Sequence, residues 1–213
     1  LGQFAGDQFA LIASATATNE ESYALQKFTR DVMGSNNVSL AAAFPEHDDV
    51  DQLVQTLRGI NGPAIRSVRD ASCILAIGTN PFESHPILGL EVRHALSRGA
   101  SLITVDARHT RMAEQSTLWL QPNIATDHLL LAGIIKALAD AGWPVGDGEH
   151  PDLDKVAQIT GVDRESIVAA ARHLAEALGK NEERLEEAVI IYGSGVTHHP
   201  TAMRVITAIH RLA

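Results

Sequence analysis

The chain has 213 residues, of which 45% are hydrophobic, and it carries a formal net charge of −9. This length allows a substantial core in one large domain or two small ones. The acidic balance argues against nucleic acid and anionic membrane surfaces as partners, because both are bound by excess Lys and Arg. One cysteine excludes a disulfide or a Cys-built metal or iron–sulfur site within these residues.

Two further features concern location and extent. No apolar run approaches the roughly 20 residues that a membrane-spanning helix needs, so we expect no direct membrane span and a cytoplasmic protein. The sequence begins with Leu1 rather than Met. We therefore expect it to be one fragment of a longer multidomain protein.

The first part of the chain predicts a strand followed by a helix. The apolar run 9–13 is typical of a short strand. Thr18 and Glu21 have the spacing of a capping box, which predicts a helix that runs to Met33. Its expected apolar face consists of Leu25, Phe28 and Val32.

A region of weak signal separates this part from the rest. Residues 39–47 show no periodicity and are expected to form a loop. Apolar residues at helical spacing predict a second helix over 50–57, and Asn61-Gly62-Pro63 ends it.

The centre of the sequence has the pattern of a nucleotide-binding βαβ unit. Residues 73–77 are an apolar strand that ends at Gly78, Pro86 begins a helix, and a second apolar run over 102–105 stops at Asp106. In such units the turn after the first strand receives phosphate on backbone N–H groups, and the acidic residue receives a hydroxyl group or a base.

The remaining elements extend this pattern into a doubly wound sheet. In chain order we expect a strand, a helix, a connector, a helix capped by Asp163, a strand and a final helix, over residues 117–120, 127–139, 142–151, 163–174, 188–192 and from 200 onward. The charged run 180–187 is expected to be a solvated surface. The predicted fold is a three-layer αβα structure with a mostly parallel sheet. We divide it into segments 1–70, 71–141 and 142–213, with the nucleotide-binding βαβ unit in the second.

The carboxyl ends of parallel strands line one crevice, so the residues that follow the strands are candidates for ligand contact. Gly78 permits close backbone approach and Asn80 offers an amide. Asp106 suits ribose hydroxyls or a guanine, although a turn residue is an equal alternative, and Arg108 suits phosphate or a surface ion pair. Asp127 is a further acceptor. The turn lacks the Gly-x-Gly-x-x-Gly pattern, so these residues alone indicate a nucleotide only weakly.

The other reactive side chains are weaker candidates. His198 and His199 are adjacent, so their side chains diverge and do not chelate one ion. His85 flanks the turn, where ligand contact and a structural role both remain open. Cys73 lies in mid-strand, where a buried thiol is inert.

Several motifs, in order, resemble the molybdopterin-guanine-dinucleotide oxidoreductases over nearly the whole chain. They are the segments 14–38 and Gly78-Thr-Asn-Pro-Phe-Glu-Ser-His-Pro86, followed by Val105-Asp-Ala-Arg108, Trp119-Leu-Gln-Pro122, Thr126-Asp127, Ile159-Thr-Gly-Val162 and Tyr192-Gly-Ser-Gly-Val-Thr197. Within that family the sequence is most similar to the G chain of bacterial NADH-quinone oxidoreductase and to formate dehydrogenase catalytic chains.

The resemblance implies a crevice that holds the guanine nucleotide arms of a molybdopterin guanine dinucleotide cofactor. The cofactor-binding residues it implies are Gly78, Asn80, Glu83 and Ser84 in a first loop, Asp106 and Arg108 in a second, Asp127 for base recognition, and His198. It also implies partner subunits or domains of a multi-subunit oxidoreductase at the inner face of a membrane. Iron–sulfur clusters would lie only in parts of the full-length protein outside this sequence.

One departure separates two functional hypotheses. In the catalytic relatives, the segment after Asn-Asn-Val brings a Cys or selenocysteine that ligates molybdenum or tungsten, whereas residues 39–45 here contain neither. The first hypothesis is therefore an electron-transfer scaffold of the G-chain type that lacks the metal ligand and is not catalytically complete. The alternative is the dinucleotide-binding domain of a formate-dehydrogenase-type enzyme whose metal ligand comes from elsewhere.

Overall fold

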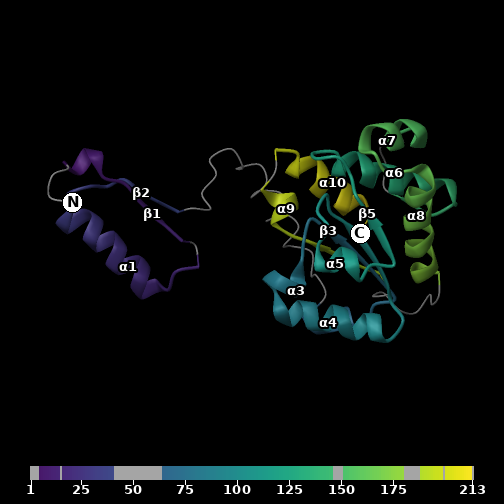
Figure 1. Cartoon of the computed structure of the whole chain (residues 1–213), viewed down its shortest axis with the longest axis horizontal. Coiled ribbons are helices and arrows are strands. Elements are labelled where there is room, and N and C mark those ends of the chain that lie inside the picture. Colours follow the sequence, from purple (N-terminus) through teal and green to yellow (C-terminus); the bar gives the residue numbers. More distant parts are fainter. Residues whose placement is uncertain are drawn as a thin grey trace. The chain divides into compact units, whose positions relative to one another are not determined.

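The computed structural model describes residues 5–14, 16–40, 64–145, 151–179, 188–198 and 200–212. The chain divides into two compact units, Leu1–Asp48 and Asp49–Ala213, which are described separately (Figure 1). The loop expected over 39–47 is wrong at its start, because residues 39 and 40 end a strand. The rest of that loop, the helix expected over 50–57 and the charged run 180–187 lie outside the described residues. The division into three segments stays a prediction.

The first unit is a short β-α-β arrangement. It contains η1 (Gly6–Gln8), β1 (Leu11–Ala13), α1 (Asn19–Lys27), a π-helical turn η2 (Phe28–Val32) and β2 (Val38–Leu40). The two strands pair in parallel, with Leu11 opposite Val38. The capping box is confirmed, because Thr18 Oγ1 accepts from the Glu21 N–H at 3.2 Å and the Thr18 N–H donates to Glu21 Oε2 at 2.8 Å.

This helix differs from its prediction after Lys27. The π-helical turn that follows shifts the side chains, so that Thr29 is buried and donates from Oγ1 to the Leu25 carbonyl at 2.8 Å. Leu25 is half-buried and the Phe28 ring meets that of Phe9 at a centroid distance of 6.2 Å, but Val32 is 68% exposed, so the expected apolar face forms only in part. The change from α to π hydrogen bonding breaks the 3.6-residue period on which the prediction depended.

The second unit is built on a parallel sheet. Its strands are β3 (Cys73–Ile77), β4 (Ser101–Val105), β5 (Leu118–Leu120) and β6 (Ala188–Tyr192), in the order β5-β4-β3-β6. All of the pairings are parallel, and Cys73 lies opposite both Ser101 and Ala188. The four strands predicted for this region are confirmed, with ends shifted by at most one residue.

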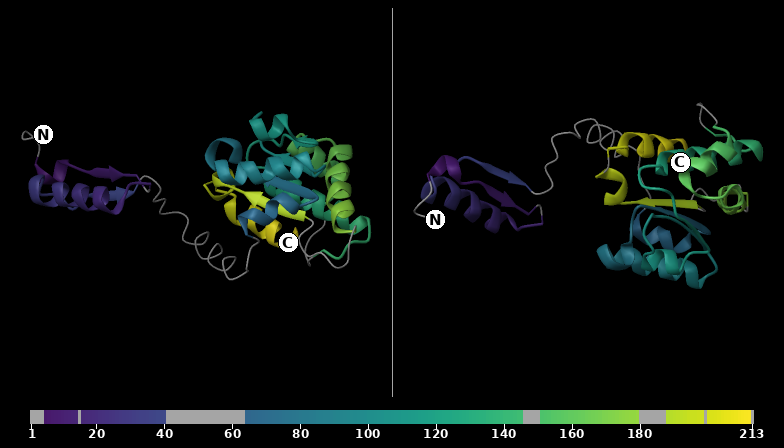
Figure 2. Two further views of the ribbon diagram at one scale, coloured as in Figure 1. Left: turned by 90° about the horizontal axis from the view of Figure 1, so that it is seen from below. Right: turned by 45° about the horizontal axis from the view of Figure 1, so that its top comes forward.

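Helices cover both faces of this sheet, as Figure 2 shows. One core lies under α6, α7, α8 and α10 and contains Leu75 and Ile77 of β3. The other lies under η3, α4 and α5 and contains Ile74 and Ala76. The bounds of the helices are Ile65–Asp70 (η3), Pro81–Ser84 (α3), Pro86–Ser97 (α4), Arg111–Glu114 (α5), Asp127–Asp140 (α6), Leu153–Thr160 (α7), Arg164–Leu178 (α8), Ser194–Thr197 (α9) and Ala202–Leu212 (α10).

Successive residues of β3 lie in opposite cores, because successive side chains of a strand point to opposite faces of the sheet. A sheet with a helix-covered core on each face confirms the three-layer αβα fold. The connections also place a switch point in the sheet. The chain leaves β3 for α4 on one face and leaves β6 for α10 on the other, although β3 and β6 are neighbours. In open α/β sheets, ligands bind outside the carboxyl ends of the strands at such a point.

Helix α7 was not predicted, because its eight residues follow a stretch rich in Gly and Pro. Asp152 caps its start by accepting from the Asp154 N–H at 2.8 Å, and Gly161 ends it with φ of 76°. Such a left-handed residue after the last turn is a common helix stop. Among the described residues, none of the helices is long and apolar enough to cross a membrane.

A partly buried ion pair joins η3 to α4. Glu91, whose side chain is 5% exposed, accepts from Arg69 Nε at 2.7 Å and from Arg69 Nη2 at 2.8 Å. The hydrogen bonds from Arg69 hold the pKa of Glu91 below its usual value, against the effect of burial. The pair fixes the helix α4, which follows the turn after β3 and the short helix α3.

We expect Glu91→Gln to destabilise the second unit at pH 7 and to make its free energy of unfolding fall less steeply as the pH is lowered. Because the pKa of Glu91 is lower in the folded state, its ionised carboxylate contributes fully to stability above the pKa of the unfolded state, which is about 4.3. That contribution is lost as the pH falls through the folded value. Urea unfolding at pH 7, 5 and 3.5, followed by tryptophan fluorescence, measures this. Glu176→Gln, at an exposed position of α8, is the control, and equal acid sensitivity of parent and Glu91→Gln would contradict the prediction.

The single thiol is expected to be unreactive in the native protein. Burial in the middle of β3 raises the pKa of Cys73 to about 12, and the thiolate is the reactive species. A chromogenic disulfide reagent at pH 8 should therefore label the folded chain slowly and label one thiol per chain rapidly in urea. Equal rates in the two states would show that β3 opens readily.

Candidate functional site

The loops after β3 and β6 pack backbone against backbone at the switch point. Gly78 has φ of 55°, and its carbonyl accepts from the Gly195 N–H at 3.1 Å. The Gly193 N–H donates to the Ile77 carbonyl at 3.3 Å. A Cβ at Gly195 would lie 2.6 Å from the Gly78 carbonyl oxygen, so the close approach requires glycine.

The first loop leads from Gly78 into α3 and leaves a buried acceptor without a partner. The Asn80 carbonyl accepts from the N–H groups of Glu83 and Ser84 and from Ser84 Oγ, at 3.0 to 3.1 Å. The Asn80 side chain does not cap the helix, and its Oδ1 is shielded from solvent with no hydrogen-bond partner among the described residues. A buried acceptor in this state costs about 1–3 kcal/mol, which a donor on a ligand would recover.

The second loop is a compact turn after β4. Asp106 is 5% exposed, and its Oδ1 accepts from the Arg108 N–H at 2.9 Å. The same carboxylate contacts the Arg108 guanidinium at 3.3 Å through both Nε and Nη2. Arg108 itself is 73% exposed. The hydrogen bonds with Asp106, and next its charge, raise the pKa of Arg108, so this guanidinium is a permanently charged donor at the edge of the sheet.

Helices α3 and α5 bring the two loops together. Arg111 Nε lies 4.0 Å from Glu83 Oε1, and the charge of Glu83 also raises the pKa of Arg108. Glu83 and Ser84 are exposed, and the helices α3 and α5 lie close together (Figure 1). Four predicted positions, Asn80, Glu83, Asp106 and Arg108, therefore border one part of the carboxyl edge.

The other predicted residues lie on neighbouring elements. Asp127 is the first residue of α6 and is half-buried, two residues after Ala125, which has φ of 70°. Asn123 ties this loop to α7, because its N–H donates to the Thr160 carbonyl at 2.7 Å. His198 follows α9 and is exposed. The roles of Asp127 and His198 in cofactor binding stay predictions.

For His85, ligand contact and a structural role were both left open, and the structure shows a local contact of its ring. The His85 ring is exposed, with Nδ1 2.8 Å from Ser84 Oγ, and that contact orders the end of α3. His199 lies outside the described residues. Within the described ranges there is no group of three or more His, Cys, Asp or Glu residues placed to hold a metal ion.

Two residues of the motif Trp119-Leu-Gln-Pro122, to which the sequence assigns no role, contact the second loop. Trp119 Nε1 donates to the Asp106 carbonyl at 2.9 Å, and Gln121 Nε2 donates to the Ala107 carbonyl at 3.0 Å. They stand at alternate positions of β5 and the residue that follows it, so both project from one face. The signals in the sequence were this period-two spacing and the place of both residues in the motif Trp119-Leu-Gln-Pro122.

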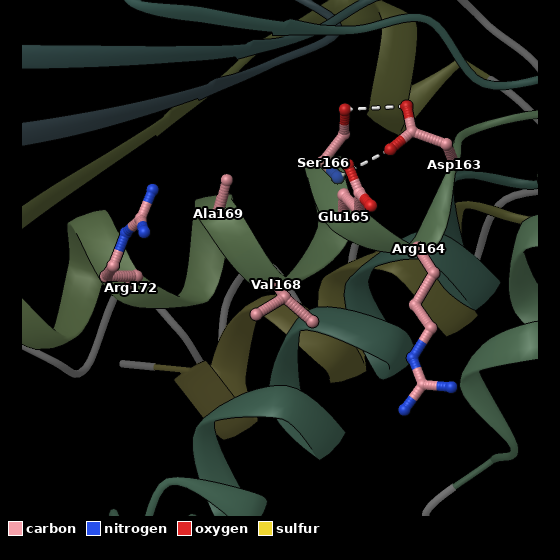
Figure 3. A pocket seen from close by; sticks show the side chains of 7 residues that line it. All are labelled: Asp163, Arg164, Glu165, Ser166, Val168, Ala169 and Arg172. Carbon is pink, nitrogen blue, oxygen red and sulfur yellow. Dashed lines mark hydrogen bonds between the residues drawn. The ribbon is translucent and has the colours of Figure 1, made fainter.

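A surface pocket lies elsewhere, along the first half of α8 (Figure 3). Its side chains diverge, with Val168 and Ala169 pointing to opposite sides of the helix. Asp163 accepts from the N–H and Oγ of Ser166 at 2.8 and 2.7 Å, and these bonds hold the pKa of Asp163 below its usual value. Asp163 is the predicted cap of this helix, and the pocket gathers no convergent polar groups.

The fold described above is that of an α/β protein of the parallel, doubly wound class. The family profile described as molybdopterin oxidoreductase matches residues 3–213. The chain therefore belongs to the molybdopterin oxidoreductase family.

Individual relatives agree with this assignment. The chain is 30% identical over 230 residues to the formate dehydrogenase-like protein YrhE of Bacillus subtilis, which covers 99% of this chain and 22% of that protein. It is 30% identical over 223 residues to the F420-dependent formate dehydrogenase subunit alpha of Methanocaldococcus jannaschii, covering 97% of this chain and 32% of that subunit. The chain thus spans about a fifth to a third of these relatives.

A solved structure shows the same fold. The acetylene hydratase from Pelobacter acetylenicus aligns with a TM-score of 0.62 over 99% of this chain and 29% of the hydratase. At 22% identity this likeness concerns the fold alone.

Proposed function

We propose that this chain is the dinucleotide-binding part of a formate-dehydrogenase-type molybdopterin oxidoreductase, and that its carboxyl edge holds the guanine nucleotide arm of the cofactor. The observation that carries the proposal is the Asp106–Arg108 turn, in which a buried carboxylate fixes an exposed guanidinium. The formate dehydrogenases among the relatives support this choice over the G-chain scaffold.

The residues at this edge fit a nucleotide. Arg108 is the planar donor that binds phosphate bidentately. Asn80 Oδ1 is a buried acceptor that lacks a donor, and a ribose hydroxyl or a base N–H would supply one. Glu83 and Ser84 border the same loops, with Asp127 and His198 proposed as the base-recognition residue and a further contact.

A bound molybdopterin-type cofactor supplies redox chemistry through its metal. The contribution of this chain is to hold and orient the nucleotide arm, because the cysteine among its described residues is not available as a thiolate ligand. Cys73 is buried in mid-strand with its pKa raised to about 12, and it does not serve as a thiolate ligand. We propose that the metal ligand and the iron–sulfur clusters belong to other parts of the full-length protein. Its partners would be subunits of a complex at the inner face of a membrane.

A second candidate is the metal-free scaffold of the G-chain type, favoured by the absence of Cys from residues 39–45. Metal analysis and oxidised-pterin fluorescence on the full-length native protein separate the two. Stoichiometric molybdenum or tungsten supports the enzyme, and its absence from protein that still carries pterin supports the scaffold.

Calorimetry with GDP tests the proposed nucleotide site on this chain. We expect GDP to bind and the Arg108→Ala and Asp106→Ala variants to bind about tenfold or more weakly, since charge-assisted hydrogen bonds contribute about 1.5–3 kcal/mol. Arg172→Ala, at an exposed position of α8, is the matched control and should bind as the parent does. Absence of GDP binding, or equal binding by Arg108→Ala, would overturn the proposal.

A further inference from the structure

The turn after β4 receives two hydrogen bonds from side chains of the neighbouring strand region. The Asp106 carbonyl accepts from Trp119 Nε1 at 2.9 Å, and the Ala107 carbonyl accepts from Gln121 Nε2 at 3.0 Å. Two consecutive peptide groups are thereby fixed from one side, by residues that stand two apart along β5 and its end. Among the described residues, the backbone adds one bond there, from the Asp106 N–H to the Leu120 carbonyl at 3.3 Å.

The direction of the Arg108 guanidinium depends on this turn. The side chain is 73% exposed, so packing does not hold it. It is directed by the position of its own backbone and by the Asp106 carboxylate, both of which belong to the turn. A shift of the Asp106 or Ala107 peptide would therefore move the guanidinium and its carboxylate partner together.

The Trp119 ring is itself restrained. The His109 ring meets it edge to face, with ring centroids 4.8 Å apart and an interplanar angle of 67°. His109 follows Arg108 directly, so the turn and the indole hold each other. Edge-to-face aromatic pairs of this kind stabilise beyond the area that they bury.

We propose that Trp119 and Gln121 are positioning residues of the nucleotide site, which act by holding the turn that carries Asp106 and Arg108. The inference rests on the proposed function for its ligand, but the restraint on the turn is a separate claim. Neither residue needs to touch the nucleotide. Their effect on binding is expected to pass through Arg108.

Two variants remove the donor and keep the bulk of the side chain. Trp119→Phe keeps an aromatic ring for His109, and Gln121→Met keeps an unbranched side chain of similar length. We expect each to weaken GDP binding about threefold to tenfold, the range of one lost hydrogen bond. Gln121→Lys retains an N–H donor and should recover most of the loss. Trp143→Phe, the same change at the other tryptophan, is the control and should leave GDP affinity unchanged.

A double-mutant cycle separates positioning from general stabilisation. In the Arg108→Ala background, Trp119→Phe should change GDP affinity by less than about twofold. If Trp119→Phe lowers GDP affinity by the same factor with and without Arg108→Ala, the effect of Trp119 does not pass through Arg108 and the inference is overturned. The melting temperatures of Trp119→Phe and Trp143→Phe are also compared by circular dichroism. If GDP affinity falls only in proportion to the lost stability in these two variants, the inference is overturned.

Hydrogen exchange provides a measure that needs no ligand. The Arg108 amide, held by Asp106 Oδ1 at 2.9 Å, should exchange about threefold to tenfold faster in Trp119→Phe. Unchanged exchange overturns the positioning role even if the parent binds GDP. If the Arg108 amide exchanges faster in Trp119→Phe but the parent does not bind GDP, the restraint on the turn is upheld and the proposed function is overturned instead.

Discussion

Gly195→Ala is expected to destabilise the second unit by about 1–3 kcal/mol, the usual cost of forcing a methyl group into a packed contact. The added Cβ would lie 2.6 Å from the Gly78 carbonyl oxygen and 3.0 Å from Gly78 Cα. These are backbone atoms, so no side-chain rotation relieves the collision. The loops after β3 and β6 must separate, which also breaks the hydrogen bond from the Gly195 N–H to the Gly78 carbonyl.

Urea unfolding followed by tryptophan fluorescence measures this effect, because both tryptophans, Trp119 and Trp143, belong to the second unit. Ser194→Ala, an exposed neighbour in α9, is the control and should change the free energy of unfolding by less than about 0.5 kcal/mol. GDP affinity of Gly195→Ala should fall as well, since Gly78 begins the first loop. Parent-like stability would show that the two loops do not pack as closely as the structure has them.

Ile77→Ala is expected to destabilise the same unit by about 2–5 kcal/mol. Ile77 is the last residue of the central strand β3 and is fully buried in the core under α6, α8 and α10. Truncation removes apolar contacts and leaves a cavity, because neighbouring strands on both sides prevent collapse. A shift of roughly 10 °C in the melting temperature corresponds to this loss in a unit of this size.

A graded series checks the mechanism. Ile77→Val removes one methylene group and should cost about 0.5–1.5 kcal/mol. Ile87→Ala in α4, where the isoleucine is 67% exposed, is the matched control with a small expected effect. If Ile77→Ala and Ile87→Ala cost the same, the burial of β3 described above is wrong.

Local patterns were sufficient where local chemistry decides structure. The apolar run at Cys73–Ile77 that stops at Gly78 predicted β3 and its turn, and the Thr18 and Glu21 pair predicted the start of α1. Prediction failed where the backbone left the regular period, as in the π-helical turn after Lys27. It also failed at α7, whose start at Asp152 follows Gly and Pro residues that usually mark a connector.

The candidate site shows the same division. Asp106 and Arg108 were identified because they follow a strand, and the structure joins them through hydrogen bonds within one turn. The alternatives of turn residue and ion pair describe the contacts that these two residues make, and their role in ligand binding stays a prediction. Trp119 and Gln121 were missed as contributors, because their partners lie on a different strand.

The sequence alone determined the class of this protein. The order of its strands, glycine turns and acidic residues predicted a parallel αβα sheet, and its ordered motifs indicated the molybdopterin oxidoreductase family, because each of these signals lies within a short stretch of chain. Only the tertiary structure decided how the loops meet. The contact of Gly195 with Gly78 and the bond from Trp119 to Asp106 depend on strand order and register, which arise from packing between residues far apart in the sequence.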